Sequence, residues 1–282
     1  MTLLSIQSHV AYGHVGNSAA VFPLQRIGVD VWPVHTVQFS NHLGYDSWKG
    51  EVFAAAHVRD VVAGIAERGA FAACEGVISG YMGSADIGEA ILEAVARVKQ
   101  DNPNAKYCCD PVIGDDESGI YVHDDIPDFM RTRALAVADV VCPNQFELGV
   151  LTGLDTGTMD GMLAAVDFLH AFGIGTVLVT SALIDETPDG AIDMIASGPD
   201  GQFRLRTPRL PIEVSGAGDT IAALFFAHFL RSSSAAEALS RSGSSLFGVL
   251  KQTAARGARE MLLVEAQEEF VAPSQVFKAE KL

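Results

Sequence analysis

The sequence predicts an α/β fold in which one mainly parallel sheet is covered by helices on both faces. Short apolar segments alternate along the chain with segments of helical periodicity, and this alternation is typical of βαβ units. The chain has 282 residues, of which 49% are hydrophobic, so it can build a large core. Because no linker, repeat or low-complexity tract divides it, we expect a single domain over residues 1–282.

The predicted strands are short, apolar and rich in β-branched residues. In chain order they span residues 2–8, 29–39, 76–81, 105–110, 139–144 and 176–181. Residues 185–210 interrupt the alternation with turn signals such as "TPDG" and "GPDG", and they predict a hairpin.

The predicted helices have apolar residues at a spacing of three and four. They span residues 17–28, closed by Gly28, then 57–69, then 84–100 with Ser84 as N-cap, and 159–173. The last third of the chain is mostly helical, and its most apolar part follows the turn "SGAGDT" (215–220).

Composition restricts the partners. The formal net charge of −16 argues against nucleic acid or an anionic membrane surface as the main partner. A phosphorylated ligand is still compatible, because backbone N–H groups at helix starts bind phosphate without lysine. The four cysteines form no CxxC pair, and no signal peptide or membrane-length apolar run is present. We therefore expect a soluble cytoplasmic protein.

Polar residues at strand ends are the first candidates for a site, because ligands of open parallel sheets bind outside the carboxyl ends of the strands. The candidates are Ser8, Tyr81, Asp110, Asn144, Thr180 and the turn 216–219.

The turn Gly216-Ala217-Gly218-Asp219 predicts a phosphoryl-transfer site. Its glycines permit a tight turn, and the N–H groups of residues 217–219 would form an anion hole at a helix start. Asp219 would accept an alcohol proton, with a pKa that we expect the helix dipole to lower. A loose transition state tolerates such a weak base. The alternative is an ordinary aspartate in the first turn of a helix.

Two acidic segments are candidates for metal and phosphate binding. Asn144 and Glu147 lie three residues apart after a strand, where they either orient a metal-water network or form a capping box. Asp110 and Asp115 belong to "CDPVIGDDESG" (109–119), which we predict to be a mobile loop. They are either oxygen ligands for Mg²⁺ or part of a solvated acidic loop.

Other catalytic classes lack their motifs. There is no GxxxxGK[ST] phosphate loop and no GxSxG nucleophile turn. His9 and His14 have no metal-ligand spacing and are interpreted as ordinary polar residues. Tyr81 either stacks on a flat ligand or covers the edge of the sheet.

Six segments together resemble the ribokinase superfamily and, within it, the pyridoxal kinases. In chain order they are "SIQSHVAYGHVGNSAA", "VWPVHTVQFSNH", "SGYMGSA", "CDPVIGD", "PNQFE" and "SGAGDT". The resemblance implies a three-layer α/β/α ribokinase-like fold without a large separate lid. It also implies ATP-dependent, Mg²⁺-assisted phosphorylation of the 5′-hydroxymethyl group of pyridoxal by a homodimer.

The resemblance also assigns roles to residues. Asp219 would be the base, with Gly216, Ala217 and Gly218 as the anion hole. Ser8 would bond the polar edge of the pyridine ring. The other substrate-side residues would be Val15, Val37, Phe39, Leu43, Gly44 and Tyr81. The residues toward ATP would be Asp110, Asp115, Tyr121, Cys142, Asn144, Glu147, Thr180, Ser181, Thr207, Pro208, Arg209, Leu210 and Gly218, with Asp110 and Glu147 managing the metal.

One departure from the family bears on specificity. After "VQFSNH" the family usually has a threonine whose hydroxyl meets the substrate, whereas this chain has Leu43. Loss of a hydrogen-bond donor changes specificity strongly. The alternatives are a kinase for another hydroxymethyl heteroaromatic, such as hydroxymethylpyrimidine, or for a sugar alcohol, and a non-catalytic vitamin B6 or nucleotide binder. The intact Asp219 and glycines favour catalysis.

Overall fold

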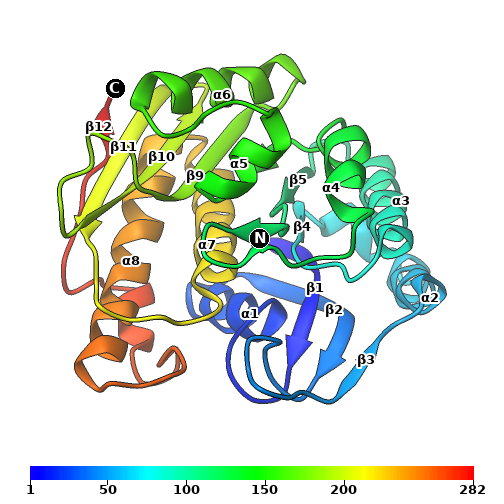
Figure 1. The fold of residues 1–282 in the computed structure, drawn as a ribbon. Helices are drawn as coiled ribbons and strands as arrows, with labels where there is room; N and C mark the ends of the chain where they lie inside the picture. The colour runs from blue at the N-terminus through cyan, green and yellow to red at the C-terminus, as the bar shows by residue number, and fades with distance from the viewer.

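The computed structural model describes all 282 residues, and its centre is a ten-stranded sheet (Figure 1). The strand order is β12-β11-β10-β9-β8-β5-β4-β1-β2-β3. The strands are β1 (Thr2–Val10), β2 (Asp30–Phe39), β3 (Gly50–Val52), β4 (Gly76–Ser79), β5 (Lys106–Cys109), β8 (Val140–Val141), β9 (Thr176–Ala182), β10 (Ala191–Gly198), β11 (Gly201–Pro208) and β12 (Glu280–Lys281).

The middle of the sheet is parallel and its edges are antiparallel. Strands β2, β1, β4, β5, β8 and β9 pair in parallel, as the alternation of strands and helices predicts. The predicted hairpin in residues 185–210 is β10 and β11, which extend the sheet beyond β9. The short strands β3 and β12 carry no signal that the sequence analysis used, and they pair at the two outer edges.

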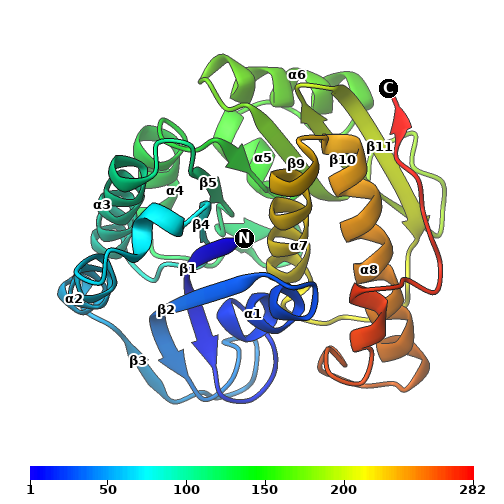
Figure 2. The same cartoon turned by 180° about the vertical axis from the view of Figure 1, so that it is seen from behind.

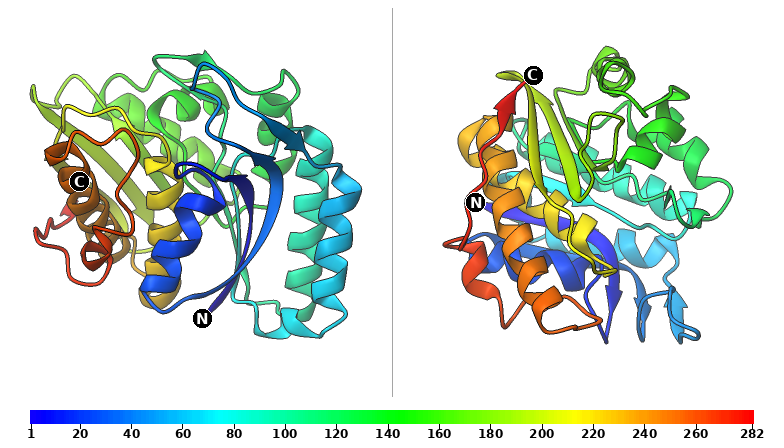
Figure 3. Two further views of the ribbon diagram at one scale, coloured as in Figure 1. Left: turned by 90° about the horizontal axis from the view of Figure 1, so that it is seen from below. Right: turned by 60° about the vertical axis from the view of Figure 1, so that its left-hand side comes forward.

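Helices cover both faces of the sheet and make three layers (Figures 2 and 3). On one face lie α1 (Asn17–Arg26), α7 (Ala217–Ser232) and α8 (Ala235–Ala255). On the other face lie α2 (Ala55–Ala66), α3 (Ala85–Asp101), α4 (Ile126–Phe129), α5 (Gln145–Thr152) and α6 (Met159–Ala171). The four predicted helices correspond to α1, α2, α3 and α6.

The sheet has a hydrophobic core on each face, because side chains along each strand alternate between the two faces. Leu4 and Val77 belong to the core under α2–α6, whereas their chain neighbours Leu3 and Ile78 belong to the core under α1, α7 and α8. Successive side chains of a strand point to opposite faces, so an apolar run serves both layers. This is why the predicted strands contain almost no polar alternation.

Helix α7 is buried along most of its length. Every residue from Thr220 to His228 is buried, because α1, α8 and the sheet surround the helix. The Phe226 ring packs so closely on β4 that a Cβ at Gly76 would come within 2.7 Å of it. Close packing of this kind leaves the helix no room to shift along its axis.

The segment 109–119, which we predicted as a loop, is partly ordered into a hairpin. Residues in β6 (Gly114–Asp115) and β7 (Gly119–Ile120) pair antiparallel, outside the main sheet. Gly114 permits this pairing, because a Cβ there would lie 2.2 Å from the carbonyl oxygen of Gly119.

No helix in the structure combines the length and the apolar composition needed to cross a membrane.

A buried amide joins α1 to the sheet. The Asn17 side chain accepts a hydrogen bond from Ser5 Oγ at 2.7 Å and donates to the Val34 carbonyl at 3.0 Å. It also lies 3.0 Å from His35 Nδ1. These partners belong to β1 and β2, so one side chain fixes the start of α1 over two parallel strands.

We expect Asn17→Ala to lower the free energy of unfolding by about 2–3 kcal/mol, because it leaves several buried polar groups unpaired. The melting temperature should fall by about 6 °C. Thermal denaturation measures this, with Asn104→Ala as control, since the exposed Asn104 side chain makes no hydrogen bond. Equal melting temperatures for the two variants would contradict this role of Asn17.

Candidate active site

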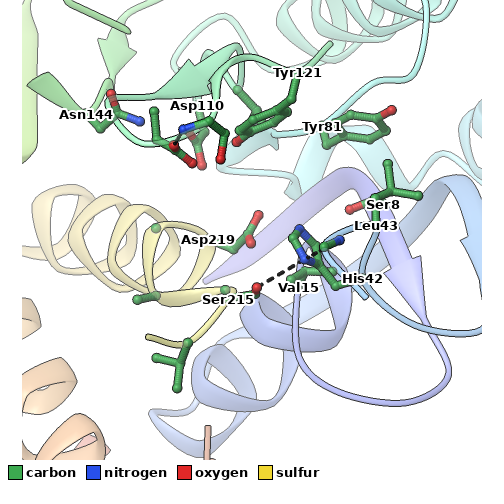
Figure 4. A pocket seen from close by; sticks show the side chains of 18 of the residues that line it. Ser8, Val15, His42, Leu43, Tyr81, Asp110, Tyr121, Asn144, Ser215 and Asp219 are labelled. Atoms are coloured by element: carbon green, nitrogen blue, oxygen red, sulfur yellow. Dashed lines mark hydrogen bonds between the residues drawn. The ribbon is translucent and has the colours of Figure 1, made fainter. Parts of the chain in front are cut away.

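A cleft of about 530 Å³ opens at the carboxyl ends of the parallel strands, where the strand-end rule places a ligand. Figure 4 shows that its labelled side chains come from β1, the loops after several strands, and the start of α7. The predicted residues that line it are Ser8, Val15, Phe39, Leu43, Gly44, Tyr81, Asp110, Asp115, Tyr121, Cys142, Asn144, Glu147, Thr180, Ser181, Gly216, Ala217, Gly218 and Asp219.

The turn before α7 has the geometry of an anion site. Gly216 adopts φ 86°, and no side chain caps the first N–H groups of the helix. A Cβ at Gly216 would lie 1.8 Å from the His14 carbonyl oxygen, so both the backbone angle and the close approach require glycine. A Cβ at Gly218 would meet nothing within 4 Å, which leaves space beside the helix start for an anion.

Asp219 lies in the first turn of α7, at the floor of the cleft. The sequence-based expectation that the helix dipole lowers its pKa is wrong. Burial raises the pKa of the Asp219 carboxyl above its ordinary value, although the Gly16 amide and His42 act in the opposite direction. Loss of hydration outweighs the dipole here, because the half-buried carboxyl group lies at the floor of the cleft, where protein surrounds it on most sides. Asp219 is therefore a stronger base than predicted.

Asp110 and Glu147 form the acidic end of the cleft, and Asp219 lies beside it. Asp110 and Glu147 are buried, at 6% and 4% exposure. Burial raises the pKa of Asp110 well above its ordinary value, and the charges of Glu147 and Asp219 add to the shift. Burial raises the pKa of Glu147 to about 7, against hydrogen bonds from the backbone. This end of the cleft would be stabilised by a cation.

Asn144 and Glu147 form the capping box that was one of their two interpretations. Glu147 Oε2 accepts from the Asn144 N–H, and Asn144 Oδ1 accepts from the Glu147 N–H, at 2.9 and 2.8 Å. Glu147 Oε1 accepts from the Ile113 N–H at 2.9 Å. Both oxygens of Glu147 are therefore occupied by backbone donors.

The residues present fit Mg²⁺ only in part. No group of three or more His, Cys, Asp and Glu side chains is placed to hold a metal by itself. The Asp110 carboxylate faces the cleft, and its side chain has no hydrogen-bond donor within the protein. Mg²⁺ prefers one or two carboxylates together with phosphate oxygens and water. Asp110 suits that role directly, whereas Glu147 suits it through water.

The opposite end of the cleft is mainly apolar, with Ser8 and His42 as its polar side chains. Ser8 is buried at a register shift between β1 and β2, which turns its side chain toward the cleft. Val15, Phe39 and Tyr81 pack together beside it. The Phe39 ring also contacts the exposed Trp48 ring, with centroids 4.5 Å apart. Figure 4 shows Asp219 between this apolar wall and the acidic end.

Comparison with known proteins identifies the family. Residues 73–261 match the family described as phosphomethylpyrimidine kinase. The chain is 53% identical to pyridoxal kinase PdxY of Rubrobacter xylanophilus, covering 100% of this chain and 98% of that protein. It is 49% identical to pyridoxal kinase PdxY of Corynebacterium diphtheriae, covering 100% of both. The chain belongs to the pyridoxal kinase family.

A solved structure supports the same assignment for the fold. The pyridoxal kinase from Leishmania donovani, in complex with ADP and pyridoxamine, matches with a TM-score of 0.91 and 28% identity over 100% of this chain and 99% of that one. The same kinase is also known in complex with ADP and pyridoxine. The three-layer fold expected from the resemblance is confirmed.

Two groups of predicted residues do not line the cleft of this kinase. Val37 is fully buried behind the wall, packed on Val10, Val15 and Phe39. It can support a ring-binding surface but does not reach it. Residues 207–210 lie at the end of β11, two strands beyond Ser181 of β9. They share the carboxyl edge of the parallel strands but stand outside the cleft.

Several lining residues were missed by the sequence analysis. They are Val10, Val112, Ser118, Val214, His42 and Ser215. His42 Nδ1 lies 3.1 Å from Ser215 Oγ, which joins the loop after β2 to the turn before α7 (Figure 4). Burial lowers the pKa of His42, although the charges of Asp219, Glu260 and Asp115 act in the opposite direction. The usable signal was position: His42 and Ser215 lie within the quoted segments "VWPVHTVQFSNH" and "SGAGDT".

The raised pKa of Glu147 predicts how the stability of the ligand-free enzyme depends on pH. The folded-state pKa of about 7 exceeds the ordinary value of 4.5, so protonation stabilises the fold. This contribution is complete below the unfolded value and is lost as the pH rises through about 7. We expect a lower melting temperature at pH 8 than at pH 6, with a loss of about 1.4 kcal/mol over this interval, because the rest of the contribution is already lost between the unfolded value and pH 6.

Differential scanning fluorimetry in EDTA at both pH values measures this difference. Glu147→Gln should remove much of it, because glutamine carries no charge and its one oxygen can still accept from the Asn144 N–H. The Ile113 N–H loses its acceptor, so the melting temperature should be lower at both pH values. Glu117→Gln, at an exposed position of the same acidic region, should leave it unchanged. A Glu147→Gln enzyme with the full pH difference would assign the effect to other groups.

Proposed function

We propose that this enzyme transfers the γ-phosphoryl group of ATP to the 5′-hydroxymethyl group of pyridoxal, yielding pyridoxal 5′-phosphate and ADP. The observation that carries the proposal is the position of Asp219. It lies beside the free N–H groups at the start of α7, between an apolar wall and an acidic, cation-seeking end of one cleft. An alcohol on a flat ring and a metal-bound triphosphate fit those two ends, with the reaction at the point between them.

The chemistry follows from this placement. Asp219 accepts the proton of the 5′-hydroxyl group as its oxygen attacks the γ-phosphorus, and the bond from the γ-phosphorus to the β–γ bridging oxygen breaks to release ADP. The N–H groups of Ala217, Gly218 and Asp219 hold the oxygens of the migrating phosphoryl group. Positioning supplies most of the rate enhancement for such a loose transition state.

The apolar wall orients the substrate. Val15, Phe39 and Tyr81 bound the flat ring, and Tyr81 stacks on its face. Ser8 bonds the polar edge of the ring. The Leishmania donovani kinase binds pyridoxamine and pyridoxine, and this supports a pocket for the same ring here.

The acidic end of the cleft would bind the triphosphate of ATP together with its metal ion. Asp110 would hold Mg²⁺, which neutralises charge on the phosphate oxygens, and Glu147 would orient its water ligands. Thr180 and Ser181 would reach the phosphate, and Tyr121 would close over the nucleotide with Asp115 of the hairpin. Thr207, Pro208, Arg209 and Leu210 would border the adenosine outside the cleft. The ADP complexes of the Leishmania donovani kinase support nucleotide binding.

The assembly and location of the enzyme are also proposals. The resemblance supports a homodimer. The four cysteines are all free and buried, which suits a reducing cytoplasm.

A second candidate substrate is hydroxymethylpyrimidine, because the family that matches residues 73–261 is described as phosphomethylpyrimidine kinase, which names a related pyrimidine. That match does not include Ser8, Val15, Phe39 or Leu43, which line the substrate end. The full-length identity to PdxY proteins includes them, and it favours pyridoxal.

The role of Asp219 predicts that Asp219→Ala lowers kcat by at least about 10²-fold, because the base is lost. The affinity for ATP should stay within about threefold, since the other phosphate-binding groups remain. Steady-state kinetics and calorimetric ATP titration measure the two quantities. Glu213→Ala removes an exposed carboxylate six residues earlier and should leave both unchanged. Near-normal turnover by Asp219→Ala would refute the mechanism.

The position of Leu43 in the cleft predicts a change of specificity. Leu43→Thr should shift the ratios of kcat/KM among pyridoxal, pyridoxine and pyridoxamine by roughly tenfold, because the new hydroxyl can bond the substrate. Leu43→Val is the control, because valine has the branched shape of threonine but lacks its hydroxyl group. A coupled assay with these vitamers and hydroxymethylpyrimidine measures the ratios. Unchanged ratios would mean that residue 43 does not face the acceptor, and preference for the pyrimidine would favour the second candidate.

A further inference from the structure

We propose that Glu260, which lies outside the cleft, is a positioning residue that fixes the two substrate-side loops against the turn before α7 and so sets the affinity for the phosphoryl acceptor. The two loops are residues 11–16, between β1 and α1, and residues 40–49, between β2 and β3. Glu260 itself follows α8 and contributes no atom to the lining of the cleft. The proposal rests on the proposed function of the cleft.

Each carboxylate oxygen of Glu260 serves a different loop. Glu260 Oε2 accepts from the backbone N–H of His14 at 3.3 Å. Glu260 Oε1 accepts a hydrogen bond from the Tyr45 hydroxyl group. The carboxylate also lies directly on the first loop, because a Cβ at Gly13 would come within 2.4 Å of Oε2. One carboxylate thus joins two segments that are about thirty residues apart in the chain.

A second contact holds the Tyr45 ring from the same segment. The guanidinium carbon of Arg259 lies 4.3 Å from the centroid of the ring. The hydrogen bond to Glu260 raises the pKa of Tyr45 to about 12, so the hydroxyl remains a donor at any physiological pH. The ion and the aromatic ring therefore fix the loop by two independent interactions.

The two loops lead directly into the cleft. Residues 11–16 contribute Val15 to its lining, and their His14 carbonyl oxygen packs on Gly216. Residues 40–49 contribute His42, Leu43 and Gly44 to the lining. His42 also reaches Ser215, just before the turn. Glu260 therefore closes a ring of contacts that runs through both loops to the anion site.

This ring of contacts has a distinct energetic consequence. Hydrogen bonds to a carboxylate are roughly twice as strong as neutral ones, so Glu260 restrains both loops before a ligand arrives. Loops that are ordered in advance lose less conformational entropy when the acceptor binds. Both loops line the end of the cleft opposite Asp110 and Glu147. Loss of Glu260 should therefore weaken binding of the alcohol substrate and spare ATP.

The experiment compares Glu260→Ala with wild-type enzyme in steady-state kinetics, varying pyridoxal and ATP separately. We expect the KM for pyridoxal to rise at least about tenfold, which corresponds to the loss of one charge-assisted hydrogen bond that orders the substrate-side loops. The KM for ATP should stay within about twofold, because the lost bond does not reach the acidic end of the cleft. Glu260→Gln keeps an oxygen acceptor and should recover part of the loss. Glu265→Ala removes an exposed carboxylate of the same segment and should behave as wild type.

A double-mutant comparison tests whether Tyr45 carries the effect. The KM for pyridoxal in Glu260→Ala/Tyr45→Phe should be no higher than in Glu260→Ala alone, because the shared bond is already lost. Equal increases in both KM values, or no increase for pyridoxal, would overturn the proposal. If wild-type enzyme phosphorylated hydroxymethylpyrimidine and no vitamer, the proposed function would fail, and the same KM comparison with that alcohol would decide the role of Glu260.

Discussion

The site depends on where α7 begins. The Gly216 backbone lies against the His14 carbonyl oxygen with no room for a side chain, and the helix that follows is buried between α1, α8 and the sheet. A helix packed on all sides cannot slide to suit a ligand. Its first N–H groups and Asp219 are consequently preorganised, and a preorganised site needs no rearrangement when charge moves during a reaction. The apolar run after the turn is the physical support of the polar groups.

Electrostatics divides the cleft into two ends with different requirements. Burial raises the pKa values of Asp110, Glu147 and Asp219, and the charges of Glu147 and Asp219 raise that of Asp110 further, in a chain of net charge −16. Such an end attracts a cation and repels a bare triphosphate. Anion binding must therefore come from backbone N–H groups and from a metal that accompanies the nucleotide. The same arrangement explains how an acidic protein can serve a phosphorylated substrate.

The substrate end is built from loops rather than from the sheet alone. Ser8 and Phe39 stand on strands, but Val15, His42, Leu43 and Gly44 stand on the loops after β1 and β2. Loop residues can vary without disturbing the core, which is why specificity differences accumulate there. A loop-built pocket must be restrained from outside the cleft, and the segment that follows α8 lies where it can supply that restraint.

The sequence by itself determined the alternation of the central strands with their helices, the glycine turn and the strand-end residues of the cleft, because periodicity and turn chemistry are local. It also indicated that Asn144 and Glu147 either form a capping box or orient a metal-water network. Only the tertiary structure decided that burial outweighs the helix dipole at Asp219, that Val37 lies behind the wall, and that Glu260 contacts two distant loops. A pKa and a buried surface depend on atoms contributed by several segments, and no single stretch of sequence contains them.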